Sequence, residues 1–145
     1  MERILNTPGV QMVLLPRTKD QEAEVRERWK EALADGRMII PKKAVNGLNL
    51  IWHSDLVLSG GGTIIREAAA LRVPAYSLYA GSTAAVDTYL ENNGLLTFLR
   101  SEDDIQAKLN LAKRALPTEA QLENTPALQD VVDAVVQQVL KNQGL

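Results

Sequence analysis

Residues 55–79 read DLVLSGGGTIIREAAALRVPAYSLY, and the fold predicted for the whole chain depends on this stretch. Its first apolar run, 56–59, predicts a short buried strand, and three glycines follow it. Apolar residues then recur at helical spacing from Thr63, and Pro74 should end that helix because its ring disfavours the helical conformation of the residue before it. A second apolar run follows Pro74, so the stretch is predicted to form two parallel strands joined by a helix.

The glycine turn, which is Gly60, Gly61 and Gly62, is a candidate anion-binding site. Glycine lets a ligand approach the main chain closely, and the first amides of the following helix have no partner within it. Together with the helix dipole, these amides would favour a phosphate near Thr63. Glu67 lies four residues after Thr63 on the same helix face, where its carboxylate could accept hydrogen bonds from two ribose hydroxyls. Alternatively, the glycines only make a tight turn and Glu67 only complements the helix dipole.

Strands and helices are predicted to alternate along the rest of the chain as well. The run 10–15 is apolar apart from one glutamine, which favours a strand buried on both faces of a parallel sheet. Asp20 is expected to cap the helix after it, and Ser101 with Asp104 forms a capping-box pattern. The further predicted strands are 37–41 and 95–99, the predicted helices are 20–34, 46–54, 84–92, 101–116 and 127–142, and 117–126 is a predicted linker.

This alternation predicts an α/β fold, a three-layer, doubly wound parallel sheet of about five strands with helices on both faces. Residues 1–145 are expected to form one such domain, because the sequence shows no internal repeat. Ligands of doubly wound sheets bind beyond the carboxyl ends of the strands. The loops expected at those ends are 16–19, 41–44, 59–63 and 80–83, and they hold most of the chain's chemically interesting polar residues.

The composition argues against several classes of function. The chain has 145 residues, 46% of them hydrophobic, and a net charge of −2, which indicates a folded core and disfavours nucleic-acid binding by charge. It has no cysteine and one histidine, so thiol chemistry is excluded, and neither a metal site nor a cofactor is expected. No apolar run reaches membrane-spanning length and no signal peptide opens the chain, so a cytoplasmic location is expected.

Three polar residues are weaker candidates for chemistry. His53, at the end of a short predicted helix, favours a capping or structural role over that of a general base. Ser59 precedes a glycine but lacks the glycine two positions before it that a nucleophile elbow requires. Ser82 either caps a helix or reaches the ligand. No catalytic residue is therefore assigned.

The runs VLLPRTKDQ and IIPKKAVNGLNLIWHSDLVLSGGGTIIREAAALRVPAYSLYAG resemble the carboxy-terminal domain of the DUF354 family, whose members are proposed to be glycosyltransferase-like. The resemblance extends over residues 10–99 and is densest at 60–70. More distantly, the chain resembles the UDP-N-acetylglucosamine 2-epimerases and the GT-B glycosyltransferases. These resemblances imply a Rossmann-like fold that is one half of a GT-B protein.

The resemblance also implies a ligand and the residues that bind it. In the related enzymes the glycine turn holds the diphosphate of a nucleotide sugar, and a glutamate placed like Glu67 binds the ribose. Arg17 matches an arginine that follows an earlier strand, and the loop 41–45 lies where the relatives hold the uracil base. The implied ligand is a UDP-sugar. The residues predicted to bind it are Arg17, Ser59, Gly60, Gly61, Gly62, Thr63, Glu67 and Ser82.

The chain also departs from these relatives. They carry an amino-terminal Rossmann-like domain and catalyse in the cleft between two domains, whereas this sequence is expected to begin after the first strand and helix of the carboxy-terminal domain. If the remaining strands close that gap, the five strands, counted along the chain, take the order 2-1-3-4-5, and Arg17 and the glycine turn flank one crevice. Alternatively, the lost strand leaves a fragment that must pair with another chain.

Two functional hypotheses follow. The first is a UDP-sugar-binding domain of a GT-B-like glycosyltransferase or epimerase, inactive without a separate Rossmann-like partner subunit. The second is a non-catalytic remnant or a homo-oligomeric scaffold of the same fold. A hydride-transfer enzyme is disfavoured, because the glycines lack the GxGxxG spacing of dinucleotide-binding folds.

Overall fold

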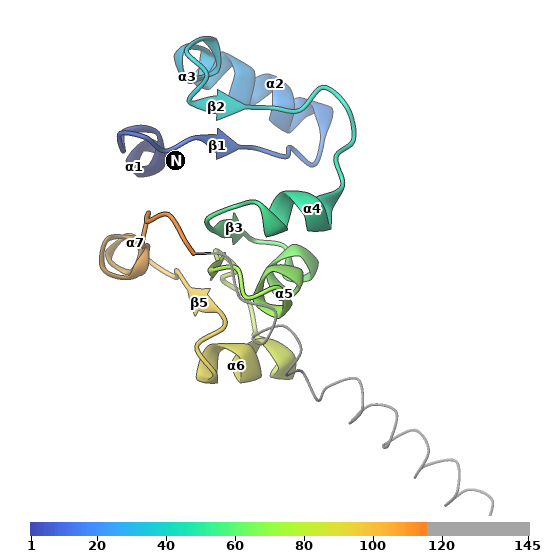
Figure 1. The fold of residues 1–145 in the computed structure, drawn as a ribbon, viewed down its shortest axis with the longest axis vertical. Helices are drawn as coiled ribbons and strands as arrows, with labels where there is room; N and C mark the ends of the chain where they lie inside the picture. Colours follow the sequence, from blue (N-terminus) through green and yellow to red (C-terminus); the bar gives the residue numbers. More distant parts are fainter. Residues whose placement is uncertain (116–145) are drawn as a thin grey trace, which may run out of the picture. The chain divides into compact units, whose positions relative to one another are not determined.

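Short parallel strands form two small sheets in the computed structural model, which describes residues 1–115. The first sheet pairs β1 (Met12–Val13) with β2 (Met38–Ile39) (Figure 1). The second sheet has the order β3 (Val57–Ser59), β4 (Ala75–Ser77) and β5 (Thr97–Phe98). The α/β class and the parallel pairing are therefore confirmed. The predicted linker 117–126 and helix 127–142 lie outside the described residues.

The single five-stranded sheet with the order 2-1-3-4-5 is not confirmed. The neighbours 2-1, 3-4 and 4-5 are present, but no backbone ladder joins β1 to β3 within residues 1–115. The two sheets meet through side chains instead, because Met12 packs both against the cluster that contains Leu5 and against the cluster that contains Tyr76. Residues 1–114 form one compact unit, and the single domain predicted for the whole chain stays a prediction.

The helices lie where the sequence places them, with different ends. The predicted helix 20–34 is divided, because Trp29 leaves the helical conformation (φ −120°, ψ 29°) and packs its partly buried indole against the cluster around Met38. Thr18 rather than Asp20 caps its start, since the Thr18 side chain accepts from the Gln21 amide at 3.2 Å. The helices are α1 (Glu2–Leu5), α2 (Lys19–Arg28), α3 (Lys30–Ala34), α4 (Gly47–Trp52), α5 (Gly62–Ala70), α6 (Ala85–Asn92) and α7 (Glu102–Lys108).

Helix α5 ends at Ala70, before the position at which Pro74 would stop it. Arg72 adopts the left-handed conformation (φ 56°), and the Val73 amide donates to the Ala68 carbonyl at 2.9 Å. This turn closes the helix after Ala70, and Pro74 follows as a residue that cannot continue it. The expectation that Pro74 itself ends the helix is therefore wrong.

Helix α7 is also shorter than its predicted range, 101–116. Its start is as predicted, because the Ser101 side chain accepts from the Asp104 amide at 3.1 Å. It ends at Lys108 because Leu109 is extended and buried at 5% exposure beside Tyr76, whose hydroxyl accepts from the next amide, Asn110, at 3.2 Å. Packing against β4 thus replaces the last predicted turns of the helix.

The main core lies between α5 and the second sheet. Ala68 is fully buried and Ala69 nearly so, which lets the α5 backbone lie close to the strands. Ile65 on the same helix face is 2% exposed. This packing fixes the start of α5 relative to the carboxyl end of β3. The buried cluster consists of Ile51, Val57, Ile65, Ala68, Ala69, Val73, Ala75, Leu96 and Phe98.

The first sheet is buried on one face only. Met38 is 1% exposed, whereas Ile39, the next residue in β2, is 38% exposed, and its register partner Val13 is 39% exposed. The predicted burial of the strand 10–15 on both faces is therefore wrong, because α2 and α3 cover one face and the described residues leave the other exposed. Among the helices of residues 1–115, none combines the length and apolar character that crossing a membrane requires.

The two faces of β2 should differ sharply in their sensitivity to substitution. Met38→Ala should reduce the free energy of unfolding by about 2–5 kcal/mol, because it leaves a cavity in the core. Ile39→Ala, one position along, should cost about 1 kcal/mol or less, since Ile39 already contacts water. Urea unfolding of both variants measures the difference. Equal losses would show that the outer face of this sheet is covered in solution.

Candidate functional site

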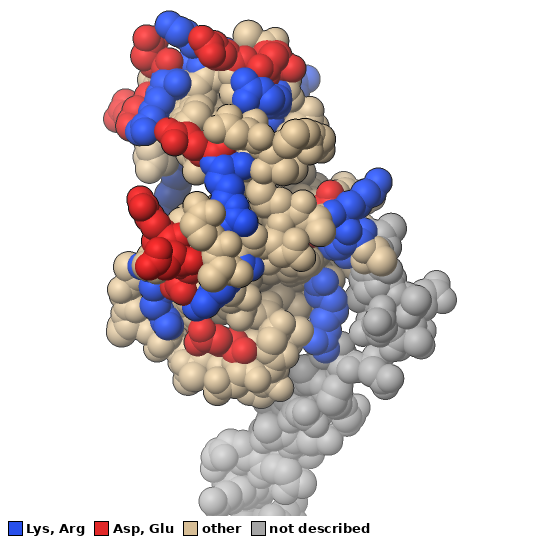
Figure 2. Space-filling model, turned by 90° about the vertical axis from the view of Figure 1, so that its left-hand side faces the viewer, with Lys and Arg blue, Asp and Glu red and all other residues tan. Residues whose placement is uncertain are grey.

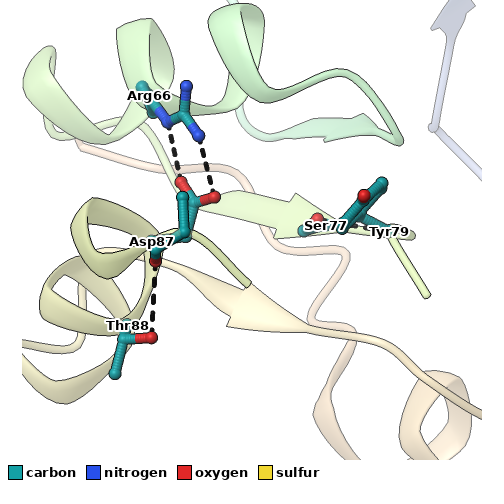
Figure 3. Close-up of polar contacts among 6 residues, drawn as sticks. Arg66, Ser77, Tyr79, Asp87 and Thr88 are labelled. Carbon is teal, nitrogen blue, oxygen red and sulfur yellow. Dashed lines mark hydrogen bonds and ion pairs between the residues drawn. The ribbon is translucent and has the colours of Figure 1, made fainter. Parts of the chain in front are cut away.

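The same kind of turn follows the carboxyl ends of β3 and β4. Ser59 and Ser77 are register partners, and each Oγ accepts a hydrogen bond from the backbone amide two residues later. The Gly61 amide donates to Ser59 Oγ at 3.0 Å, and the Tyr79 amide donates to Ser77 Oγ at 3.2 Å (Figure 3 shows the second). Ser59 therefore shapes the turn, in agreement with the absence of a nucleophile elbow.

The glycine turn opens directly into α5. Gly60, Gly61, Gly62 and Thr63 are all exposed, and no side chain caps the helix. The Gly61 amide is occupied by Ser59, but the amides of Gly62 and Thr63 have no hydrogen-bond partner among the described residues. Two main-chain donors at the positive end of the helix dipole are thus open to an anion.

Backbone conformation does not account for the three glycines of this turn. The glycines with positive φ are Gly9, Gly36 and Gly94, so none of the three in this turn needs the left-handed region. A Cβ at position 60 would meet no atom within 4 Å, and this leaves the turn open to a ligand. A Cβ at position 62 would lie 3.3 Å from the guanidinium of Arg66.

Arg66 is the residue that the sequence analysis missed. Its guanidinium lies beside Gly62 and also binds Asp87 of α6 with two hydrogen bonds, from Nε at 2.8 Å and from a terminal nitrogen at 2.9 Å (Figure 3). The signal for its position was present, since Arg66 follows Gly62 by four residues and so shares its helix face. Its partner lies 21 residues away in another helix, which spacing could not reveal.

Arg66 and Asp87 each favour the charged form of the other. The Arg66 guanidinium lowers the pKa of the Asp87 carboxyl below its usual range, chiefly through the hydrogen bonds, and Asp87 raises the pKa of Arg66. Asp87 is 14% exposed while Arg66 is 41% exposed, so the guanidinium keeps a face toward solvent. A fixed cation therefore stands beside the open amides of α5.

No side-chain hydrogen bond or ion pair among the described residues joins Arg17 or Ser82 to the glycine turn. Arg17 is exposed, and its backbone amide donates to Gln21 Oε1 at 3.0 Å. No hydrogen bond or ion pair links Arg17 to the glycine turn within residues 1–115, so the clamp stays a prediction. Ser82 is exposed and does not cap α6, whose N-cap is Ala84 without a side-chain bond. Glu67 is half-buried on α5.

Two cavities in the described part of the chain lie away from the glycine turn. One, of about 260 Å³, is lined by Arg72, Pro74, Gly94 and neighbours, at the amino end of β4. The other, of about 310 Å³, lies between α1 and the junction of α2 with α3. Neither cavity includes the glycine turn, which is exposed.

Within residues 1–115 no three His, Asp or Glu side chains gather as metal ligands. His53 is the C-cap of α4, and its Nδ1 lies 2.9 Å from the Asn49 carbonyl oxygen, which confirms its capping role. On the face that Figure 2 shows, basic and acidic side chains are interspersed.

The Arg66–Asp87 pair should make stability depend on pH. Because the pKa of Asp87 is lowered on folding, the pair stabilises the protein above the unfolded carboxyl pKa, near 4, and this contribution is lost as the pH falls through the lower, folded value. Asp87→Asn should therefore melt a few degrees below the wild type at pH 7, and the gap should close on acidification. Thermal unfolding from pH 7 to pH 2 measures it.

Glu91→Gln serves as the matched control. Glu91 faces Arg100 at 3.9 Å and both side chains are well exposed, so its removal should leave the melting temperature almost unchanged at every pH. A gap for Asp87→Asn that persists unchanged at pH 2 would contradict the assigned role of the ion pair.

Comparison with known proteins places the chain in a family. Residues 1–143 match the family model described as "Protein of unknown function (DUF354)". The curated "Uncharacterized protein MJ0665" of Methanocaldococcus jannaschii is 31% identical over 90 residues, which is 62% of this chain and 24% of that protein. The chain thus spans about a quarter of the length of this relative, and no solved structure matches it. Since the family match covers nearly the whole sequence, the chain belongs to the DUF354 family.

Proposed function

We propose that the chain is the UDP-sugar-binding half of a GT-B-like glycosyltransferase or epimerase, with a Rossmann-like layout. The observation that carries this proposal is the open start of α5. The free amides of Gly62 and Thr63 stand at the carboxyl end of β3, which is where parallel α/β sheets bind ligands.

The start of α5 suits the diphosphate better than it suits the other parts of the ligand. Two main-chain amides and the helix dipole attract an anion without a lysine. Arg66 places its guanidinium beside Gly62, and this planar group is held in place by Asp87, which offsets part of its charge. The ion pair thus orients the cation before the ligand arrives, which reduces the entropy lost on binding.

Glu67 is the candidate ligand for the ribose. It lies one turn beyond Thr63 on α5, and its half-buried carboxylate has no hydrogen bond or ion pair with another residue of 1–115. A carboxylate accepts but cannot donate, so it suits a pair of adjacent hydroxyls. This assignment follows the resemblance to the nucleotide-sugar enzymes.

Exposed apolar side chains support a second half that covers the ligand. They lie in the segments that follow β1, β2 and β4 in sequence. Catalysis in the related enzymes needs two domains, so we expect no turnover from this chain by itself. The exposed residues are Leu15, Val45, Leu78, Tyr79 and Val86.

Calorimetric titration with UDP and UDP-N-acetylglucosamine tests the proposal. Both should bind, and Gly61→Val should abolish binding because its side chain would cover the free amides. Glu67→Ala should weaken binding about tenfold or more, the loss expected when hydrogen bonds to a charged group disappear.

Gly47→Ala is the control for general effects of replacing a glycine. Position 47 opens α4, outside the glycine turn, and a Cβ there meets no atom within 4 Å. Its UDP affinity should equal that of the wild type. Failure of the wild type to bind either ligand at millimolar concentration would favour the non-catalytic scaffold instead.

A further inference from the structure

The edge of β1 that faces away from β2 is unpaired. The amides of Met12 and Leu14 donate to the carbonyls of Arg37 and Ile39, both at 2.8 Å. Because successive residues of a strand direct their backbone groups to opposite edges, the amide and carbonyl of Val13 point to the other edge. That edge has no ladder partner within residues 1–115.

The edge of β3 that faces away from β4 is unpaired in the same way. The Val57 amide donates to the Pro74 carbonyl at 2.9 Å, and the Ser59 carbonyl accepts from the Leu78 amide at 3.0 Å. The backbone groups of Leu58, between them, therefore point to the opposite edge. Two strand edges thus present free donors and acceptors, which are templates for pairing with another strand.

The observed strand order indicates what belongs between these edges. A doubly wound Rossmann sheet has the order 3-2-1-4-5-6. If its first strand is left out, the remaining strands fall into two sheets, 3-2 and 4-5-6. This is the arrangement found here, with β2 and β1 in one sheet and β3, β4 and β5 in the other. The strand that fits the position between β1 and β3 is therefore one that precedes β1 in sequence.

Helix α1 lies where a connection from that strand would arrive. Parallel neighbours in such sheets are joined by a helix that packs on the sheet. Ile4 is buried with Tyr76 of the second sheet, and Leu5 is buried with Met38 of the first. The last turn before β1 is thus packed against both sheets, as the end of a crossover helix would be.

We propose that the edges of β1 and β3 receive one parallel strand from the part of longer family members that this chain does not match. The strand would pair through the backbone groups of Val13 and Leu58 and join the two sheets into one of six strands. Its side chains would be apolar and β-branched, because a central strand of such a sheet is covered on both faces. The length of MJ0665, of which the match covers 24%, provides a source for this strand. The proposal does not depend on nucleotide binding.

Residue-resolved amide exchange by NMR tests the proposal. The probe is the part of MJ0665 that lies outside its matched segment, produced as a separate polypeptide and added to the full chain. The amides of Val13 and Leu58 should exchange quickly in the chain alone and at least about tenfold more slowly with the probe. The amides of Met12, Leu14 and Val57, which are already bonded, should change little.

A pair of variants separates strand pairing from other contacts. Val13→Pro removes the free-edge donor while leaving the bonds between β1 and β2, and it should weaken binding of the probe about fivefold, the effect of one lost hydrogen bond. Val13→Ala keeps the amide and should bind normally. If Val13→Pro does not fold, the exchange measurement on the wild type decides by itself.

Three results would overturn the proposal. The first is absence of binding, the second is protection gained away from Val13 and Leu58, and the third is protection of both amides in the chain alone, which would mean that β1 pairs directly with β3. A UDP titration that fails while the probe binds would count only against the proposed function.

Discussion

The register of β3 against β4 is the constraint on which the candidate site depends. Ser59 and Ser77 face one another at the ends of these strands, so the two turns that follow leave the sheet at the same level. The small residues Ala68 and Ala69 then hold α5 close to the sheet, which directs its first amides beyond the strand end. A ligand site made of main-chain donors needs this rigidity, because its amides have no side-chain freedom with which to adapt.

Charge at this site comes from an ion pair and not from a cluster of cations. Asp87 offsets much of the charge of Arg66, and this keeps the guanidinium in place when no anion is bound. Because Asp87 lies in the first turn of α6, it is also favoured by the dipole of that helix. The ion pair links the starts of α5 and α6, the helices that follow the adjacent strands β3 and β4. The packing of the second sheet therefore positions the charge beside the glycine turn.

Local signals in the sequence were sufficient to predict the helices and strands. They were insufficient to predict how these elements pack together. Asn46, Ser101 and Gly36 act through neighbours within a few residues, so the helix ends that they mark were predictable. The break at Trp29 and the early end of α7 at Lys108 depend on burial against other elements, which periodicity does not contain. Glycine spacing located the open turn, but the partnership of Arg66 with Asp87 and the missing pairing of β1 with β3 are long-range properties.

The most direct test of the central claim, that the first free amides of α5 receive an anion, is a nitrogen-15 NMR titration. The account predicts that UDP and inorganic pyrophosphate both shift the amides of Gly62 and Thr63 in a saturable way, and that uridine without phosphate does not. Saturable shifts confined to other regions, or no shift at these two amides with millimolar UDP, would contradict it.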